Sequence, residues 1–204
     1  MDLPDPNSKT IRGIYYSFDY GDAHFMVLNT SLTSKNSIDK EQKEWLTKDL
    51  AATNKKWKII MLHAPLISSK NCNNSYIAAE LQTYGVDVVL QAHEHVYMRS
   101  YPYYKDQEPL KDSPTETRNG IKYYLDPGGT IYSTFATGGP SDQSLKSTAD
   151  LNNLAVAGNG LPSSWGDISI DGNTLTVKTY YYNDGNIQLY PDGAWGIIKN
   201  NHPS

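Results

Sequence analysis

The chain has 204 residues, a net charge of −4, 38% hydrophobic and 20% charged residues, and one cysteine, Cys72. These values are typical of a soluble globular domain. They give no basic stripe for a nucleic-acid partner, no run of about 18 apolar residues for a membrane span, and no pair of cysteines for an intrachain disulfide. We therefore expect no nucleic-acid partner and no membrane segment, while the composition leaves the cell compartment open.

Two β-rich runs open the interpretable part of the chain. Residues 14–20 and 23–28 are rich in aromatic and aliphatic side chains, and Gly21-Asp22 separates them. A two-residue separation with glycine is typical of a tight hairpin turn. We therefore expect an antiparallel hairpin here.

The next segment has the period of a helix. Residues 38–52 place the apolar side chains of Ile38, Trp45, Leu46 and Leu50 at a helical period. Ser37 or Asp39 is the expected N-cap, and Gln42 is a possible capping-box partner of Asp39.

A strand–helix–strand unit follows. Residues 57–62 and 86–92 are short apolar runs, as in strands that are covered on both faces, and residues 76–84 between them favour a helix. Such units place their two strands in parallel.

The second half of the chain is rich in strands and loops. We expect loops at 104–120, which is charged, and at 138–165, which is rich in Gly, Ser, Asn and Asp. Gly172-Asn173 and Asp184-Gly185 are hairpin signals. The expected strands are residues 121–125, 130–137, 167–171, 174–182, 186–190 and 194–198.

Histidines stand just after both apolar strands of the parallel unit. His63 follows the first strand, and His93 and His95 follow the second. Parallel strands would bring these side chains to one edge of the sheet, where ligands bind in α/β folds. Imidazole is the commonest metal ligand among side chains, and residues i and i+2 of an extended segment project to the same side. A lone H-x-H pair or a lone strand-end histidine is more often an ordinary surface feature, but the combination predicts a metal site.

These strand ends resemble a known family. A-H-E-H-V-Y-M-R at residues 92–99 is similar to the G-H-x-H-x-Y-x-R motif of purple acid phosphatases, within the calcineurin-like metallophosphoesterases. M-L-H-A-P-L resembles the histidine motif that precedes it, and the similarity covers most of the chain. The resemblance implies an α/β fold: a four-layer α/β/β/α sandwich, of which residues 1–204 would be the β-rich C-terminal half. It also implies hydrolysis of phosphate monoesters by a binuclear metal centre and suggests a secreted or cell-envelope location.

The resemblance assigns roles to particular residues. His63 and His93 would bind one metal ion and His95 the other, and the ions could be Fe, Zn or Mn. Tyr97 and Arg99 would hold the histidine loop in place. Ala92 stands where the motif has glycine, so the loop geometry is expected to shift slightly, because alanine tolerates positive φ poorly.

Three motifs of the family are absent from this sequence. They are D-x-G, G-D-x-x-Y and G-N-H-[DE], which carry the metal-binding carboxylates, an asparagine ligand and a catalytic histidine. Gly21-Asp22-Ala23-His24 imitates one of them weakly, but it sits in the expected hairpin and is interpreted as structural. The catalytic residues are therefore unknown from this chain.

We expect the missing motifs on an N-terminal half outside residues 1–204, which would be a partner of this chain. The chain alone should be inactive, because three neutral imidazoles cannot balance the charge of two metal ions. Without that half, we expect an unpaired sheet edge beside residues 57–62 or 86–92 and possible self-association.

A different class of function is also compatible with the sequence. Trp165, Trp195 and the run Tyr180-Tyr181-Tyr182 lie in the strand-rich region and could form a carbohydrate- or cell-wall-binding face without catalysis. Core packing explains part of this run, because Tyr180 and Tyr182 would share one sheet face and Tyr181 the other.

Overall fold

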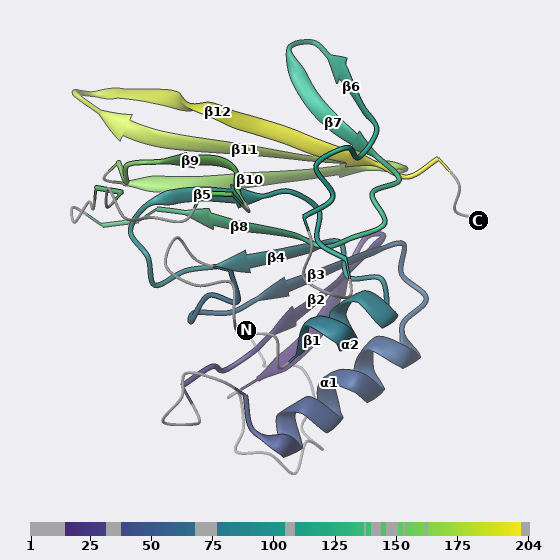
Figure 1. Cartoon of the computed structure of the whole chain (residues 1–204). Coiled ribbons are helices and arrows are strands. Elements are labelled where there is room, and N and C mark those ends of the chain that lie inside the picture. Colours follow the sequence, from purple (N-terminus) through teal and green to yellow (C-terminus); the bar gives the residue numbers. More distant parts are fainter. Residues whose placement is uncertain are drawn as a thin grey trace.

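Two β-sheets pack face to face, and two helices cover the outer side of the larger sheet (Figure 1). This arrangement comes from a computed structural model. It describes residues 15–31, 38–67, 77–104, 109–136, 138–139, 144–145, 151–152, 154–161 and 163–200. The sheet order in the larger sheet is β1-β2-β3-β4-β8-β5-β9, and in the smaller sheet β10-β11-β12-β7-β6.

The larger sheet contains the predicted hairpin and the predicted parallel unit. Its strands are β1 (Tyr16–Tyr20), β2 (Ala23–Val27), β3 (Trp57–Met61), β4 (Val88–Gln91), β5 (Tyr97–Ser100), β8 (Ile131–Phe135) and β9 (Leu154–Gly158). Strands β2, β3, β4 and β8 run parallel, while β1 and β5 are antiparallel to their neighbours. The β3–α2–β4 crossover is therefore confirmed, as is the turn at Gly21-Asp22, where Gly21 has φ 55°.

The smaller sheet contains the two other predicted hairpins. Its strands are β6 (Thr115–Arg118), β7 (Ile121–Leu125), β10 (Ser164–Asp171), β11 (Thr174–Asn183) and β12 (Asn186–Ile198). Asp171 pairs with Thr174 across Gly172-Asn173. Asn183 pairs with Asn186 across Asp184 and Gly185, whose φ values are 48° and 82°.

Alternate residues of the larger sheet fill two separate cores. Ile60 and Val89 face the helices and pack with Leu46 of α1 (Lys40–Ala52) and Leu81 of α2 (Ala78–Thr83). The other face belongs to the core between the sheets, where Trp195 is buried. In the described residues both helices belong to the first core, so the structure shows three of the four layers expected.

The N-terminus of α1 follows the sequence prediction in part. Asp39 is the N-cap, and its side chain accepts a 2.8 Å hydrogen bond from the backbone N–H of Gln42. The Gln42 side chain does not close a capping box. It is fully buried and exchanges two hydrogen bonds with the backbone of Asn29, at 2.8 and 2.9 Å, so it ties the helix to the chain after β2.

Several expected boundaries are wrong. The expected loop at 104–120 contains strand β6, and the expected loop at 138–165 contains β9 and the first residues of β10. The strands expected at 186–190 and 194–198 form one strand, β12, with a register shift opposite Lys178 and Tyr180. In each case pairing with a neighbouring strand outweighs a local sequence preference for loop.

The expected free edge beside residues 57–62 or 86–92 is also wrong. Strand β3 is paired with β2 and β4, and β4 is paired with β3 and β8. Both strands are therefore central, and the edges of the larger sheet are β1 and β9. Self-association through an unpaired edge at β3 or β4 is therefore no longer expected. Self-association through other surfaces stays a prediction.

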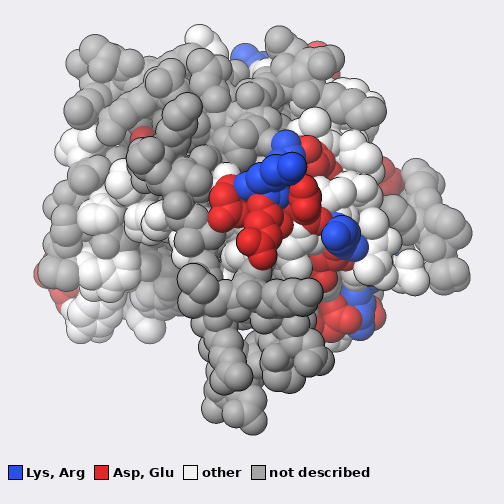
Figure 2. Space-filling view, turned by 90° about the horizontal axis from the view of Figure 1, so that it is seen from below, with Lys and Arg blue, Asp and Glu red and all other residues white. Residues whose placement is uncertain are grey.

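The face on which the helices lie has mixed charge. Acidic and basic side chains interleave on the described part of this surface (Figure 2). The helices carry two ion pairs, Lys40–Glu44 within α1 and Lys43–Glu80 between α1 and α2. Among the described residues, no helix is long and apolar enough to cross a bilayer.

Candidate metal centre

Two adjacent parallel strands bring His63 and His93 to the same edge of the larger sheet. Met61 of β3 is the register partner of Leu90 of β4. The ladder continues past the strand ends, because the backbone N–H of Leu62 donates to Leu90 O at 3.0 Å and that of Ala92 to His63 O at 3.2 Å. The predicted meeting of His63 and His93 is therefore confirmed, while that of His95 with them stays a prediction.

The two imidazoles face each other directly. His93 Nδ1 lies 3.3 Å from His63 Nε2, and the rings meet edge to face with centroids 5.3 Å apart. Both side chains are exposed. Two nitrogens bound to one tetrahedral ion at about 2.0–2.1 Å would lie about 3.3–3.4 Å apart. The spacing thus fits two ligands of one ion, and it also fits an N–H···N hydrogen bond between neutral rings.

His95 is half-buried at the start of the segment that leads into β5. Within the part of the chain that the structure describes, no group of three or more His, Cys, Asp or Glu side chains is arranged to hold a metal ion. The described residues therefore supply a histidine pair rather than a full ligand set.

The histidine loop is locally strained, but not at the residue that the sequence suggested. The loop residue with positive φ is His93, at 69°, and not Ala92. Positive φ is uncommon for residues other than glycine and costs of order 1 kcal/mol or more. The alanine is therefore accommodated, and the strain lies in the backbone of His93, a residue expected to bind metal.

Tyr97 and Arg99 lie between the two sheets. Tyr97 packs on Tyr190 with ring centroids 4.4 Å apart, and burial raises the pKa of its hydroxyl. The Arg99 guanidinium is buried over the ring of Trp195 at 5.3 Å, and its Nε and Nη1 have no hydrogen-bond partner in the described structure. These contacts join β5 to the smaller sheet. The expectation that both residues hold the histidine loop stays a prediction.

Two buried polar side chains that the sequence analysis missed position the loop after His63. Thr30 Oγ1 accepts a 2.8 Å hydrogen bond from the backbone N–H of Ala64. Gln91 Oε1 accepts from the backbone N–H groups of Leu66 and Ile67, at 3.0 and 3.3 Å. A glutamine inside an apolar strand is an unusual signal, because a buried amide needs partners.

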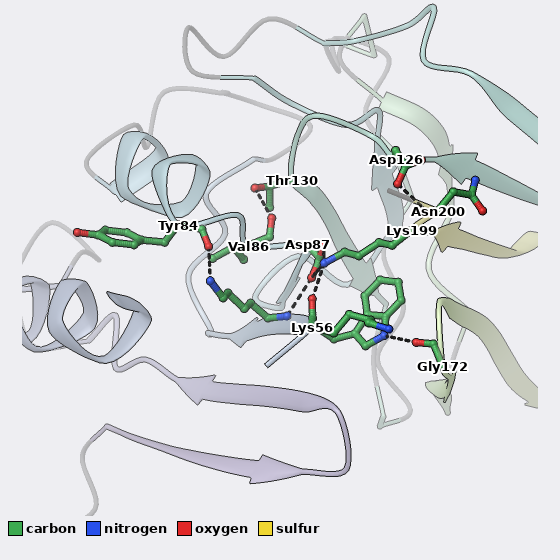
Figure 3. A network of polar contacts seen from close by, with 11 residues as sticks. Lys56, Tyr84, Val86, Asp87, Asp126, Thr130, Gly172, Lys199 and Asn200 are labelled. Carbon is green, nitrogen blue, oxygen red and sulfur yellow. Dashed lines mark hydrogen bonds and ion pairs between the residues drawn. The ribbon is translucent and has the colours of Figure 1, made fainter. Parts of the chain in front are cut away.

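An open polar cavity of about 750 Å³ lies at the opposite ends of the parallel strands. Its lysines bind acceptors of the protein itself, since Lys56 binds Asn173 and Lys58 binds Tyr84 O. Lys199 binds Asp87 (Figure 3). Burial and the nearby Lys199 lower the pKa of Lys58, with Asp87 opposing them. The charged side chains that line the cavity thus connect the two sheets.

The aromatic residues of the alternative interpretation divide between the core and the surface. Trp195 is fully buried, and Tyr181 packs against Tyr190. Trp165 and Tyr180 are paired across β10 and β11, with ring centroids 5.8 Å apart, and they line an open cavity of about 430 Å³ with Asp167. The Trp165–Tyr180 pair therefore remains accessible to a ligand, whereas Trp195 does not.

Comparisons with known proteins show similarity to calcineurin-like phosphoesterases. A family model described as calcineurin-like phosphoesterase matches residues 3–97. Purple acid phosphatase 15 of Arabidopsis thaliana is 31% identical over 158 residues, which is 72% of this chain and 26% of that protein. Acid phosphatase type 7 of Homo sapiens is 33% identical over 122 residues, 47% of this chain and 28% of that protein.

A solved structure agrees with this class at the level of the fold. A purple acid phosphatase from seeds of yellow lupin (Lupinus luteus) superposes with a TM-score of 0.67 and 22% identity over 92% of this chain and 33% of that one. The chain therefore has a metallophosphoesterase fold. Within that fold, its similarity is to purple acid phosphatases. It spans 26–33% of the lengths of these three relatives.

Proposed function

We propose that this chain contributes the histidine part of a binuclear metal centre that hydrolyses phosphate monoesters. The observation that supports this most is the 3.3 Å separation of His63 Nε2 and His93 Nδ1 at the ends of two parallel strands. The relatives named as acid phosphatases support the reaction class.

In this proposal His63 and His93 bind one ion and His95 binds the other, with Fe, Zn or Mn as candidates. Two bound ions would supply an activated water and stabilise the charge of the transferred phosphoryl group. This chain's own residues hold the ligands in place: Gln91 and Thr30 fix the loop after His63 through buried hydrogen bonds. Neutral imidazoles alone leave the charge of the ions uncompensated.

We further propose that the carboxylates, the asparagine ligand and the catalytic histidine come from polypeptide outside residues 1–204. Two observations support this. The described residues hold no ligand set of three, and the chain spans only 26% of Purple acid phosphatase 15. Residues 1–204 would then be the C-terminal half of the catalytic domain.

Co²⁺ binding tests the role of the histidine pair, because its absorption bands report the donor set. We expect His63→Ala and His93→Ala each to weaken Co²⁺ binding by more than the roughly 10–100-fold that follows loss of a supporting contact. His202→Ala removes a histidine outside the described residues and serves as the matched control. Equal binding by all four proteins would mean that the pair is only hydrogen-bonded.

A second candidate, carbohydrate binding, rests on the accessible Trp165–Tyr180 pair with Asp167 beside it. Aromatic faces offer flat apolar surface, and a nearby carboxylate can accept hydrogen bonds from hydroxyl groups. Retention of the chain on insoluble polysaccharide, lost in Trp165→Ala, would favour it. No retention of the wild type would eliminate it.

A further inference from the structure

One buried imidazole joins three elements away from the candidate metal centre. His24 of β2 is only 6% exposed. Its Nδ1 lies 2.7 Å from Asp19 Oδ1 of β1, and its Nε2 lies 2.9 Å from Asp49 Oδ2 of α1. Both ring nitrogens therefore face carboxylates, and the hairpin is connected to the helix through this side chain.

Only one protonation state satisfies both contacts. An ionised carboxylate can only accept hydrogen bonds, and a neutral imidazole carries a single N–H. Two N–H donors require the imidazolium, and each bond is then assisted by charge. A neutral ring would place one bare nitrogen against a carboxylate oxygen.

Other charged groups near the ring are already engaged. Lys55 Nζ, just beyond α1, lies 2.8 Å from Gly21 O and 3.8 Å from Asp19 Oδ2. Lys58 of β3 is the register partner of His24, but its ammonium group donates to Tyr84 O at 2.7 Å. The carboxylates of Asp19 and Asp49 are thus the groups that hydrogen-bond the imidazole.

We propose that His24 is a pH-dependent clamp that holds the β1–β2 hairpin against α1 while its ring is protonated and releases it when the ring loses a proton. Asp49 and Asp19 act together in this clamp, and the proposal does not depend on metal binding.

The direction of the pH dependence follows from the contacts. Burial by itself lowers the pKa of His24, but the hydrogen bonds and charges of Asp49 and Asp19 outweigh it, so the pKa is raised above its ordinary value. The clamp's contribution to stability is therefore complete below about pH 6.5, provided that the carboxylates are ionised. It is lost as the pH rises through the raised pKa of the folded state.

The release should be local. The far end of the same helix is held separately, because Gln42 binds the backbone of Asn29. Thr30, the next residue, holds the loop after His63. Loss of the clamp should therefore loosen β1 and the hairpin turn while the chain around His63 stays in place.

A pH titration by NMR tests the clamp directly. In the wild-type chain the His24 ring should titrate above about pH 6.5, and in Asp49→Asn, which keeps an acceptor but removes the charge, it should titrate lower. The protection factors of the β1 amides, which correct for base catalysis of exchange, should fall across the same pH range in the wild type, while that of the Ala64 amide stays constant. A wild-type titration at or below the ordinary value overturns the proposal.

Unfolding experiments give a second readout. Between about pH 6 and about pH 9, the folding equilibrium of the wild type should weaken relative to Asp49→Asn by at least about threefold. Lys40→Gln, which breaks an exposed ion pair on the same helix, is the control and should follow the wild-type profile. Parallel profiles for the wild type and Asp49→Asn would overturn the clamp even if His24 variants fail to fold.

Discussion

The Lys199 ammonium group lies 2.7 Å from the Asp87 carboxylate and joins the end of β12 to the residue before β4 (Figure 3). The pair therefore connects the two sheets. Both side chains are nearly buried, at 8% and 10% exposure. The same ammonium group also donates to Lys56 O and lies 4.6 Å from the centroid of the Trp57 ring.

We predict that Lys199→Met destabilises the chain by about 3 kcal/mol, because it removes the ammonium group that neutralises the nearly buried Asp87 carboxylate. Lys58 cannot replace it fully, since its ammonium group is committed to Tyr84 O. Urea unfolding measures the free energy. Lys40→Met is the control: its ion pair with Glu44 is exposed at 92% and 58%, and such pairs are worth about 0–1 kcal/mol. Equal effects of the two variants would contradict the predicted role of the junction.

Two adjacent glycines before β8 should respond very differently to alanine. A Cβ on Gly129 would lie 2.3 Å from Tyr103 O, while a Cβ on Gly128 meets nothing within 4 Å. The clash is with backbone that pairs with Thr130, so it cannot be relieved by turning a side chain. We expect Gly129→Ala to cost about 1–3 kcal/mol or more, and Gly128→Ala to be near neutral, as measured by thermal unfolding. Similar melting temperatures for both variants would mean that this loop can shift freely.

The sequence predicts those turns and strands that are determined by neighbouring residues in the chain. Tight turns are predicted at Gly21-Asp22 and Asp184-Gly185 because glycine and aspartate adopt positive φ more readily than most residues. The structure shows positive φ at Gly21, Asp184 and Gly185. The apolar runs of β3 and β4 indicate buried parallel strands because both faces are covered. Because these strands are parallel neighbours, their ends bring His63 beside His93, as the sequence predicts.

The strands that were missed depend on distant partners. Strand β6 is polar and largely exposed, and it exists through its pairing with β7. Strand β9 consists of Leu154–Gly158 and pairs with β5, about 55 residues earlier in the chain. The role of Gln91 was missed for the same reason, since its partners Leu66 and Ile67 lie in the loop after β3, 25 and 24 residues earlier.

Replacing Arg99 can distinguish a role in the stability of the fold from a role in holding the histidine loop. Its guanidinium is buried with Nε and Nη1 unpaired in the described structure, so removing the charge should not destabilise the fold. We predict that Arg99→Met keeps or increases the free energy of unfolding, by about 0–3 kcal/mol, since apolar replacements of buried charges are often neutral or stabilising. Co²⁺ titration of the same variant tests the role suggested by the resemblance. Weaker metal binding at unchanged stability would indicate that Arg99 does hold the histidine loop.

The last prediction concerns activity. The chain of 204 residues should hydrolyse p-nitrophenyl phosphate feebly or not at all with added Zn²⁺, Fe³⁺ or Mn²⁺, because three imidazoles cannot bridge two ions or balance their charge. The assay needs a positive control, for which a relative named as an acid phosphatase, Purple acid phosphatase 15 of Arabidopsis thaliana, is suitable. A longer polypeptide that carries the D-x-G, G-D-x-x-Y and G-N-H-[DE] motifs ahead of this sequence should recover activity, and His93→Ala in that polypeptide should abolish it. Turnover by the isolated chain near the ordinary enzyme value of about 10 per second would show that the active site lies elsewhere in these residues.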